Sequence, residues 1–182
     1  MHMAVRTRRW TRADLVRLPD DGNRYEVVRG ELFVTPAPST YHQAVVDVLS
    51  DCLRHYVNAL RLGHVAQAPS AVVFEGSEVQ PDLLVRARTL PPPATWDEMP
   101  VPFLVVEILS RSTRRRDLTA KRSLYLDAGV AEYWIVDLDQ RSIRVVRAGA
   151  EQLLTETLQW RPVGAAEPLV LDIAAMFREA LG

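Results

Sequence analysis

Apolar residues along the chain form short runs that predict buried strands. Residues 103–109 are rich in valine, isoleucine and leucine and lie between Pro102 and the polar sequence SRST, a pattern typical of a strand inside a sheet. Residues 83–85 and 132–136 are two further apolar runs, and residues 141–147 alternate as a strand that pairs with 132–136 through the turn DLDQ. Further strands are predicted at residues 64–68 and 71–74, on the antiparallel side of the sheet, and between residues 152 and 160.

A longer periodic stretch predicts a helix over residues 39–60. Its apolar side chains recur at the spacing of one helix face: Val45, Val46, Leu49, Leu53, Tyr56 and Leu60. Ser39 or Thr40 can cap its first turn, and we expect Gly63 to terminate it. Shorter helices are predicted at residues 11–18 and 171–181.

Another helix is predicted after the strand at residues 103–109. Ser112 or Thr113 can cap its start, and Gly129 can end it in the left-handed conformation that glycine adopts at least cost. If the strands at 103–109 and 132–136 are parallel, this helix forms a right-handed crossover between them.

Residues 24–28 and 31–34 predict a β-hairpin, because the Arg-Gly pair between them suits a tight turn. With a two-residue turn, Glu26 opposes Phe33, and Glu26 and Glu31 share one face of the hairpin. The other face is apolar and is expected to join the core. The glutamate face meets solvent or looks into a site, where Glu31 or Glu26 would assist catalysis.

The composition is that of a chain of one-domain size. The 182 residues are 48% hydrophobic and contain no internal repeat, so we expect residues 1–182 to form a single α/β domain. The net charge of −1 argues against strong nonspecific attraction to nucleic acid, although a local patch can still steer a phosphate backbone. The single cysteine, Cys52, excludes an internal disulfide and points to a reducing cytoplasm. No signal peptide or membrane-spanning segment is visible, so no membrane association is expected.

Acidic residues interrupt two of the predicted strands. Asp82 stands at the start of the run at 83–85, and Glu107 lies inside the run at 103–109. A carboxylate at an otherwise apolar strand position must be neutralised, paired or bound to a cation, because an isolated buried charge is costly.

Lys121 is the only lysine in a chain that otherwise uses arginine. Lysine offers a compact charge whose proton affinity is tuned by burial, which the guanidinium group does not. Helical spacing places Lys121 on one face with Asp117 and Tyr125. A single lysine retained by chance is the alternative. Together, Asp82, Glu107 and Lys121 make the acid, acid, lysine set that binds a divalent metal ion and polarises a phosphodiester.

The order of these residues resembles the PD-(D/E)XK nuclease superfamily. The segments YEVVRGEL, VQPDLLV, VVEILSRSTRRRDLTAKRSLY and AGVAEYWIVD, with the helix that starts near His42, are similar to the Uma-type family of bacterial restriction endonucleases, from about residue 24 to about residue 147. The resemblance implies an α/β fold with a restriction-endonuclease-like core, in which a mixed β-sheet is flanked by helices, and an N-terminal β-hairpin extension. The sequence departs from the pattern at Leu109, where the superfamily usually carries its lysine, so Lys121 on the following helix is the candidate.

The resemblance also implies a metal-dependent endonuclease that acts on DNA. Asp82 and Glu107, with Glu31 as an optional third ligand, would bind Mg²⁺, with Mn²⁺ as the alternative. Lys121 would orient the nucleophile or stabilise the transition state, and Tyr125 would position Lys121 or a phosphate. A homodimer would suit the cutting of both strands, because two-fold symmetry presents two sites.

A basic run near the start of the helix is a candidate DNA contact. It comprises Arg111, Arg114, Arg115, Arg116 and Arg122. Arginine forks suit phosphate oxygens, whereas the alternative is a solvated face paired with Asp117 and Asp127. His42, in the first turn of the long helix, is usually solvated or hydrogen-bonded at such a position, and a substrate or metal role is the alternative.

Two other functions stay open at this point. The chain could be a catalytically inactive module that keeps the nuclease fold and binds nucleic acid or protein, with the acidic pair bound to Lys121 as a structural group. A metal-free hydrolase that uses two carboxylates as general acid and base is the third reading, and it leaves Lys121 without a task. Metal affinity discriminates between these functions.

Overall fold

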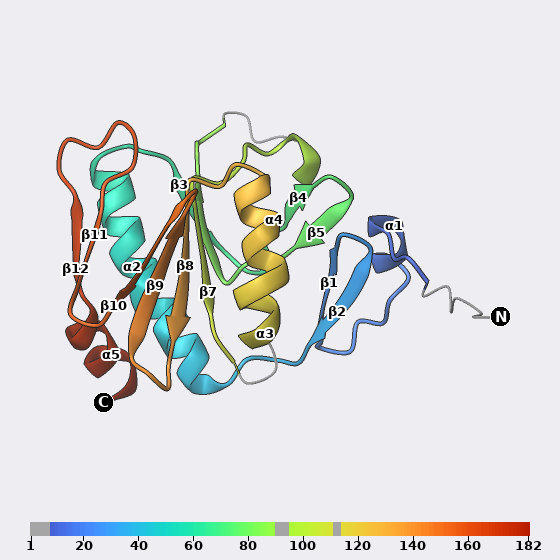
Figure 1. The fold of residues 1–182 in the computed structure, drawn as a ribbon, viewed down its shortest axis with the longest axis horizontal. Helices are drawn as coiled ribbons and strands as arrows, with labels where there is room; N and C mark the ends of the chain where they lie inside the picture. Colours follow the sequence, from blue (N-terminus) through green and yellow to red (C-terminus); the bar gives the residue numbers. More distant parts are fainter. Residues whose placement is uncertain (1–7, 90–94, 111–113) are drawn as a thin grey trace.

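A six-stranded mixed sheet lies at the centre of the computed structural model, which describes residues 8–89, 95–110 and 114–182 (Figure 1). In order across the sheet, its strands are β10 (Ala150–Leu154), β9 (Ser142–Arg147), β8 (Glu132–Asp137), β7 (Leu104–Ile108), β6 (Leu83–Arg86) and β3 (His64–Gln67). Strands β7 and β8 are parallel, and every other neighbouring pair is antiparallel. The four strands predicted from the apolar runs are confirmed, and so is the pairing of β8 with β9.

A second, antiparallel sheet contains the N-terminal hairpin. Its strands, in order, are β2 (Glu31–Thr35), β1 (Arg24–Val28), β5 (Ser77–Val79) and β4 (Val72–Phe74). The hairpin has the predicted register, with Glu26 opposite Phe33. The side chain of Glu26 is 0% exposed, whereas Glu31 is exposed beside the turn. The glutamate face therefore looks into the molecule at Glu26 and meets solvent at Glu31.

The C-terminal part differs from the prediction in one element. Strands β11 (Thr157–Trp160) and β12 (Leu169–Asp172) form a separate antiparallel pair. The closing helix was predicted from residue 171, but α5 (Ile173–Leu181) begins only after Asp172, whose side chain accepts a hydrogen bond from the Ala175 N–H at 2.8 Å. The apolar residues of β12 continue directly into those of α5, so the pattern shows no boundary between this strand and the helix.

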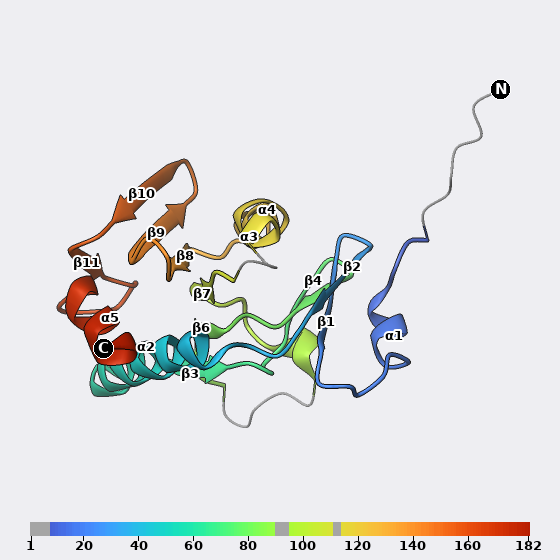
Figure 2. The same ribbon diagram turned by 90° about the horizontal axis from the view of Figure 1, so that it is seen from below.

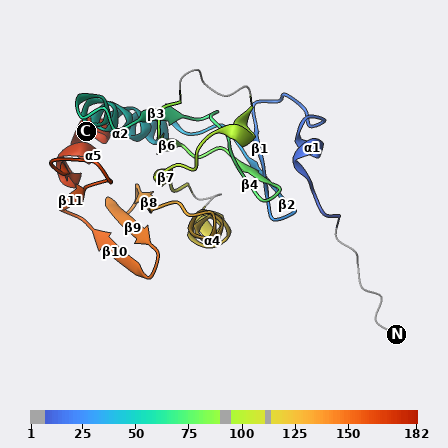
Figure 3. The same ribbon diagram turned by 90° about the horizontal axis from the view of Figure 1, so that it is seen from above.

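Helices cover both faces of the central sheet (Figures 2 and 3). On one face lie α2 (Thr40–Ala59) and α5. On the other lie α3 (Arg114–Arg116), the π-helical turn η2 (Asp117–Lys121) and α4 (Arg122–Asp127). Two short helices, α1 (Arg12–Leu15) and η1 (Trp96–Glu98), precede β1 and β7. The predicted fold class, a mixed sheet flanked by helices with an N-terminal hairpin, is confirmed. None of the helices in the described ranges is both long and apolar enough to cross a bilayer.

Alternation along β7 divides the apolar core between the two faces. Leu104, Val106 and Ile108 pack with α2, whereas Val105 packs with the residues of α4. Because successive side chains of a strand point to opposite faces, Glu107 points to the same side as Val105. This alternation is why a strand glutamate meets the helix that contains Lys121.

The helix ends are capped in two different ways. The caps predicted at Ser112 or Thr113 lie outside the described residues. Gly129 follows α4 with φ of 83°, as predicted for a left-handed terminator. After α2, however, the left-handed residue is Arg61, with φ of 54°, and Gly63 is not among the residues with positive φ. The prediction that Gly63 terminates this helix is wrong.

Gly63 instead allows two backbones to approach each other. A Cβ atom at this position would lie 2.3 Å from the carbonyl oxygen of Arg86, at the end of β6. The obstacle is backbone within the sheet, so it cannot turn away as a side chain would.

We therefore expect Gly63→Ala to lower the free energy of unfolding by about 1–3 kcal/mol, the usual cost of overpacking. Chemical denaturation of both proteins measures the difference. Asn58→Ala is the matched control, because Asn58 is exposed near the end of α2 and its replacement should change stability by less than about 0.5 kcal/mol. A Gly63→Ala protein as stable as the control would show that the sheet edge yields to the added methyl group.

Candidate functional site

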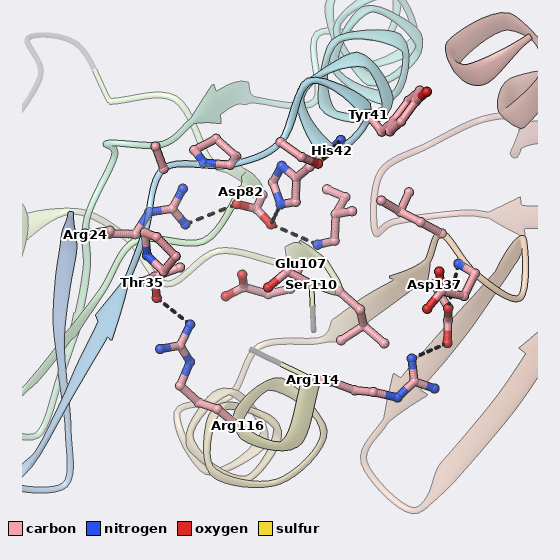
Figure 4. A pocket seen from close by; sticks show the side chains of 18 of the residues that line it. Arg24, Thr35, Tyr41, His42, Asp82, Glu107, Ser110, Arg114, Arg116 and Asp137 are labelled. Carbon is pink, nitrogen blue, oxygen red and sulfur yellow. Dashed lines mark hydrogen bonds and ion pairs between the residues drawn. The ribbon is translucent and has the colours of Figure 1, made fainter. Parts of the chain in front are cut away.

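A pocket of about 730 Å³ lies where the hairpin, the start of α2 and the ends of β7 and β8 meet (Figure 4). Its lining includes Arg24, Thr35, Tyr41, His42, Asp82, Glu107, Ser110, Arg114, Arg116, Asp137 and Arg141. The two acidic residues of the predicted set therefore reach one cavity from adjacent strands. The apolar runs of β6 and β7 fix their positions, because these runs bury both strands completely.

Asp82 is a buried carboxylate with partners on both oxygens. Oδ1 accepts a hydrogen bond from Arg24 Nη1 at 3.1 Å, and Oδ2 accepts one from the Ile108 N–H at 2.9 Å. His42 Nε2 lies 3.1 Å from Oδ2. Burial opposes ionisation, but His42, Arg24 and the Ile108 N–H together outweigh it and lower the pKa of Asp82 to about 2. Asp82 is therefore a fixed negative charge at neutral pH.

Glu107 is held by two groups of the opposite helix. Oε1 accepts hydrogen bonds from Lys121 Nζ at 2.6 Å and from the Tyr125 hydroxyl at 2.8 Å. Burial raises the pKa of Glu107 to about 8, against the opposing effect of the Lys121 charge, and the nearby Asp117 and Asp82 raise it further. The hydrogen bonds that Glu107 accepts from described residues all fall on Oε1, and the residue also lines the pocket.

Lys121 is shared between two buried carboxylates. Its Nζ lies 2.6 Å from Glu107 Oε1, 2.8 Å from Glu26 Oε1 and 3.9 Å from Asp117 Oδ1. Burial alone would lower the pKa of Lys121, but the charges of Glu107, Glu26 and Asp117 raise it, so the ammonium group stays protonated. The π-helical turn η2 ends at Lys121, and such turns re-aim side chains at functional sites.

The arginines of the basic run have separate surroundings. Arg114 lines the pocket and pairs with Asp137 at 2.8 Å, whereas Arg115 is exposed. Arg116 is buried and donates a hydrogen bond to Thr35 Oγ1 at 2.7 Å, and Arg122 pairs with Glu151 on β10. Arg111 lies outside the described residues. Arg114 and Arg115 thus remain the candidates for substrate contact.

Four of the predicted residues are not among those that line the pocket: Lys121, Tyr125, Glu31 and Arg115. Lys121 is 1% exposed and is not among the residues that line the pocket, so Glu107 stands between its ammonium group and the cavity. Glu31 does not line the pocket either, and it is exposed where β2 begins. The hairpin glutamate that reaches the buried charges is Glu26.

Sequence reasoning missed two charged residues of the site. Arg24, which binds Asp82, is the first residue of β1, and Asp137, which binds Arg114, is the last residue of β8. The cluster comprises four buried carboxyl groups, Glu26, Asp82, Glu107 and Asp117, and three cations, the half-buried Arg24 and the buried Arg116 and Lys121. No spacing in the sequence indicates that these seven residues come together, so the sequence carries no signal for Arg24 or Asp137.

The donor set can be compared with the needs of a metal ion. Within the described ranges, no group of three or more His, Cys, Asp or Glu side chains is arranged to hold a metal. Mg²⁺ keeps several water ligands and is usually bound through one or two carboxylates, so Asp82 and Glu107 at the wall of one cavity are enough for it. The residues present therefore fit hydrated Mg²⁺ better than a closed, all-protein site.

Comparison with known proteins gives one similar solved structure and one matching family model. The fold is similar to the crystal structure of a "putative nuclease belonging to DUF820" from Anabaena variabilis, with a TM-score of 0.76 and 21% identity over 94% of this chain and 99% of that one. No curated protein matches the chain. The family model Uma2, described as "Putative restriction endonuclease", matches residues 12–175. Since that match spans most of the sequence, the chain belongs to the Uma2 family of restriction-endonuclease-like proteins.

Proposed function

We propose that this protein is a divalent-metal-dependent endonuclease that hydrolyses phosphodiester bonds of DNA. The observation that carries the proposal is the convergence of Asp82 and Glu107, from adjacent strands, on one pocket that also contains arginine side chains. Membership of the Uma2 family supports a nuclease, and the pocket chemistry suits a phosphate substrate.

Asp82 and Glu107 are the proposed ligands of Mg²⁺, with Mn²⁺ as the alternative. A divalent ion held there would supply Lewis-acid polarisation of a phosphodiester and would lower the pKa of a water molecule. His42 and Arg24 hold the Asp82 carboxylate in place, and Lys121 and Tyr125 do the same for Glu107. Glu31, exposed and outside the pocket, is not included in the proposed ligand set.

Lys121 is proposed to stabilise the negative charge that develops on the phosphate in the transition state. It would act from the side of Glu107 that faces away from the pocket. Its Nζ stays charged and lies in a region that excludes water, where a fixed charge acts more strongly than at a surface. Arg114 and Arg115 are the proposed phosphate contacts beside the pocket. We also propose a homodimer, because two-fold symmetry suits the cutting of both DNA strands. A reducing cytoplasm is the proposed compartment, because Cys52 is the only cysteine of the sequence.

The second candidate is a catalytically inactive nuclease-fold module that binds nucleic acid or protein. A specific observation favours it: both oxygens of Asp82 and one oxygen of Glu107 already bind protein groups, and Lys121 is ion-paired inside the protein. In that case the charges would satisfy one another, and metal would add no stability.

Metal binding distinguishes the two candidates. We expect Mg²⁺ or Mn²⁺ at 100 times its Kd to stabilise the wild type by about 2.7 kcal/mol, as a rise in the thermal unfolding midpoint, because the ion binds only the folded site. Asp82→Asn, which keeps the shape of the side chain, should lose this rise together with metal-dependent plasmid nicking. Glu31→Gln is the matched control and should retain both. If metal fails to stabilise the wild type and no nicking occurs, the binding module takes the place of the nuclease.

The pH dependence of metal binding follows from Glu107. Its pKa of about 8 means that a proton occupies the carboxyl group at lower pH and must leave before a cation binds. We expect the affinity for Mn²⁺ to weaken by up to about tenfold per pH unit below pH 8 and to level off above it. Calorimetry in buffers of different ionisation enthalpy should detect about one proton released at pH 7. A pH-independent affinity between pH 6 and pH 9 would remove Glu107 from the ligand set.

Lys121→Met tests the buried charge balance. Without the ammonium group, Glu26 and Glu107 lose their shared counter-ion, so we expect the free energy of unfolding to fall by about 3–5 kcal/mol at pH 8. The loss should be smaller at pH 5, because the folded variant then gains protons on these carboxyl groups and sheds the uncompensated charge. Adding Glu107→Gln should recover part of the stability at pH 8. A pH-independent loss would mean that Lys121 stabilises by packing alone.

A further inference from the structure

The end of β6 that lies away from the pocket carries positive charge. Asp82 directly precedes β6 and Arg86 is its last residue, so the two are about 13 Å apart along the extended chain. Arg86 pairs in register with His64 of β3. Helix α2 begins at the pocket with His42 and runs beside β3 and β6 (Figure 2), with Arg54 in its second half.

Arg86 is a buried cation without a counter-ion. Its side chain is 1% exposed, Nη2 donates a hydrogen bond to the Ala71 carbonyl at 3.3 Å, and Nε has no hydrogen-bond partner in the described part of the chain. No ion pair of the described residues includes it, and residues 1–7, 90–94 and 111–113 contain neither Asp nor Glu. Arginine cannot give up its proton in a protein, so the charge stays. The guanidinium group lies over the Trp96 ring, 5.8 Å from its centroid, a contact that offsets only part of the cost of burying a charge without an acidic partner.

Three exposed side chains, two arginines and a histidine, lie at this end of the sheet, where the histidine pairs in register with Arg86. Arg54, His64 and Arg88 are exposed. Burial lowers the pKa of His64, and the positive charges of Arg88, Arg86 and Arg54 lower it further. Every charged group that acts on His64 is thus positive, whereas Arg24, Arg114, Arg116 and Lys121 around the pocket are all ion-paired.

We propose that Arg54, His64, Arg86 and Arg88 form a second surface for the nucleic-acid backbone, here called the cationic end. Phosphate oxygens supply the anion that the chain itself does not, and exposed guanidinium groups bind them bidentately. Arg86 adds to the field from beneath, since a charge in a region of low dielectric is weakly screened. The net charge of the protein is −1, so a local surface of this kind is what attracts a polyanion. Contacts to phosphates fix position on the substrate and carry no sequence information.

Binding in the absence of divalent metal tests the cationic end. The probe is a fluorescein-labelled duplex of about 20 base pairs, longer than the roughly 30 Å of α2, measured by anisotropy in EDTA from about 50 to 200 mM salt. Arg54→Gln/Arg88→Gln should raise the Kd at low salt by about tenfold and reduce the slope of log K against log salt by about 2. The matched control, Arg17→Gln/Arg178→Gln, removes the same charge from exposed positions elsewhere and should behave as the wild type.

Two outcomes would overturn the proposal. Equal losses in the two double variants would mean that total charge alone governs binding. Binding to phosphatidylserine vesicles that needs Arg54 and Arg88, with duplex binding unchanged, would assign the surface to a membrane. This experiment measures binding and not cleavage, so a negative result would not contradict the proposed nuclease activity. Absence of nuclease activity would likewise not contradict binding at the cationic end.

The thermal unfolding midpoint of Arg86→Met, with and without the duplex, distinguishes a role in binding from a purely structural role. Removing an uncompensated buried charge should raise the thermal unfolding midpoint of the free protein, while the additional stabilisation by the duplex becomes smaller. A lower midpoint in the free protein would show that Arg86 supports the sheet, and would exclude it from the cationic end.

Discussion

The Lys121 ammonium group joins three parts of the molecule at one buried point. It comes from the helical segment on one face of the central sheet, and its two nearest carboxylates come from β7 of that sheet and from β1 of the hairpin sheet. Two buried carboxylates would repel each other without it, so this cation stabilises the packing of the hairpin against the central sheet. The position of Asp82 depends on the same packing, because Arg24, which binds it, lies two residues before Glu26 on β1.

Strand geometry explains why the acidic residues converge on the pocket. Strands β6 and β7 are neighbours, so Asp82, before the first, and Glu107, near the end of the second, come to the same end of an antiparallel pair. The backbone N–H of Ile108 then binds Asp82 directly. Helix α2 delivers His42 to Asp82 from one face of the sheet, and α4 with η2 delivers Tyr125 and Lys121 to Glu107 from the other. Each carboxylate thus has its own partners, and the two acquire opposite pKa shifts.

Charge is distributed unevenly along the central sheet. Around the pocket, Arg24, Arg114 and Lys121 are paired with carboxylates, which fixes their side chains at some cost in desolvation. At the far end of β6, the cations have no acidic partner in the described ranges. A nearly neutral protein can in this way present one surface to polyanions and keep its acidic site close to it.

The sequence by itself determined the parts that depend on local pattern. Apolar runs identified β6, β7, β8 and β9, and the Arg-Gly turn fixed the hairpin register, because side chains alternate with a period of two. The order of Asp82, Glu107 and Lys121 indicated the superfamily, and the segments around these residues indicated the family. Tertiary structure decided which side of each pattern is buried: Glu26 and Glu31 are equivalent in the strand pattern, yet only Glu26 is covered by another element. It also decided that Arg24 pairs with Asp82 and that Gly63 lies against the carbonyl of Arg86, because both contacts join distant segments that no local spacing relates.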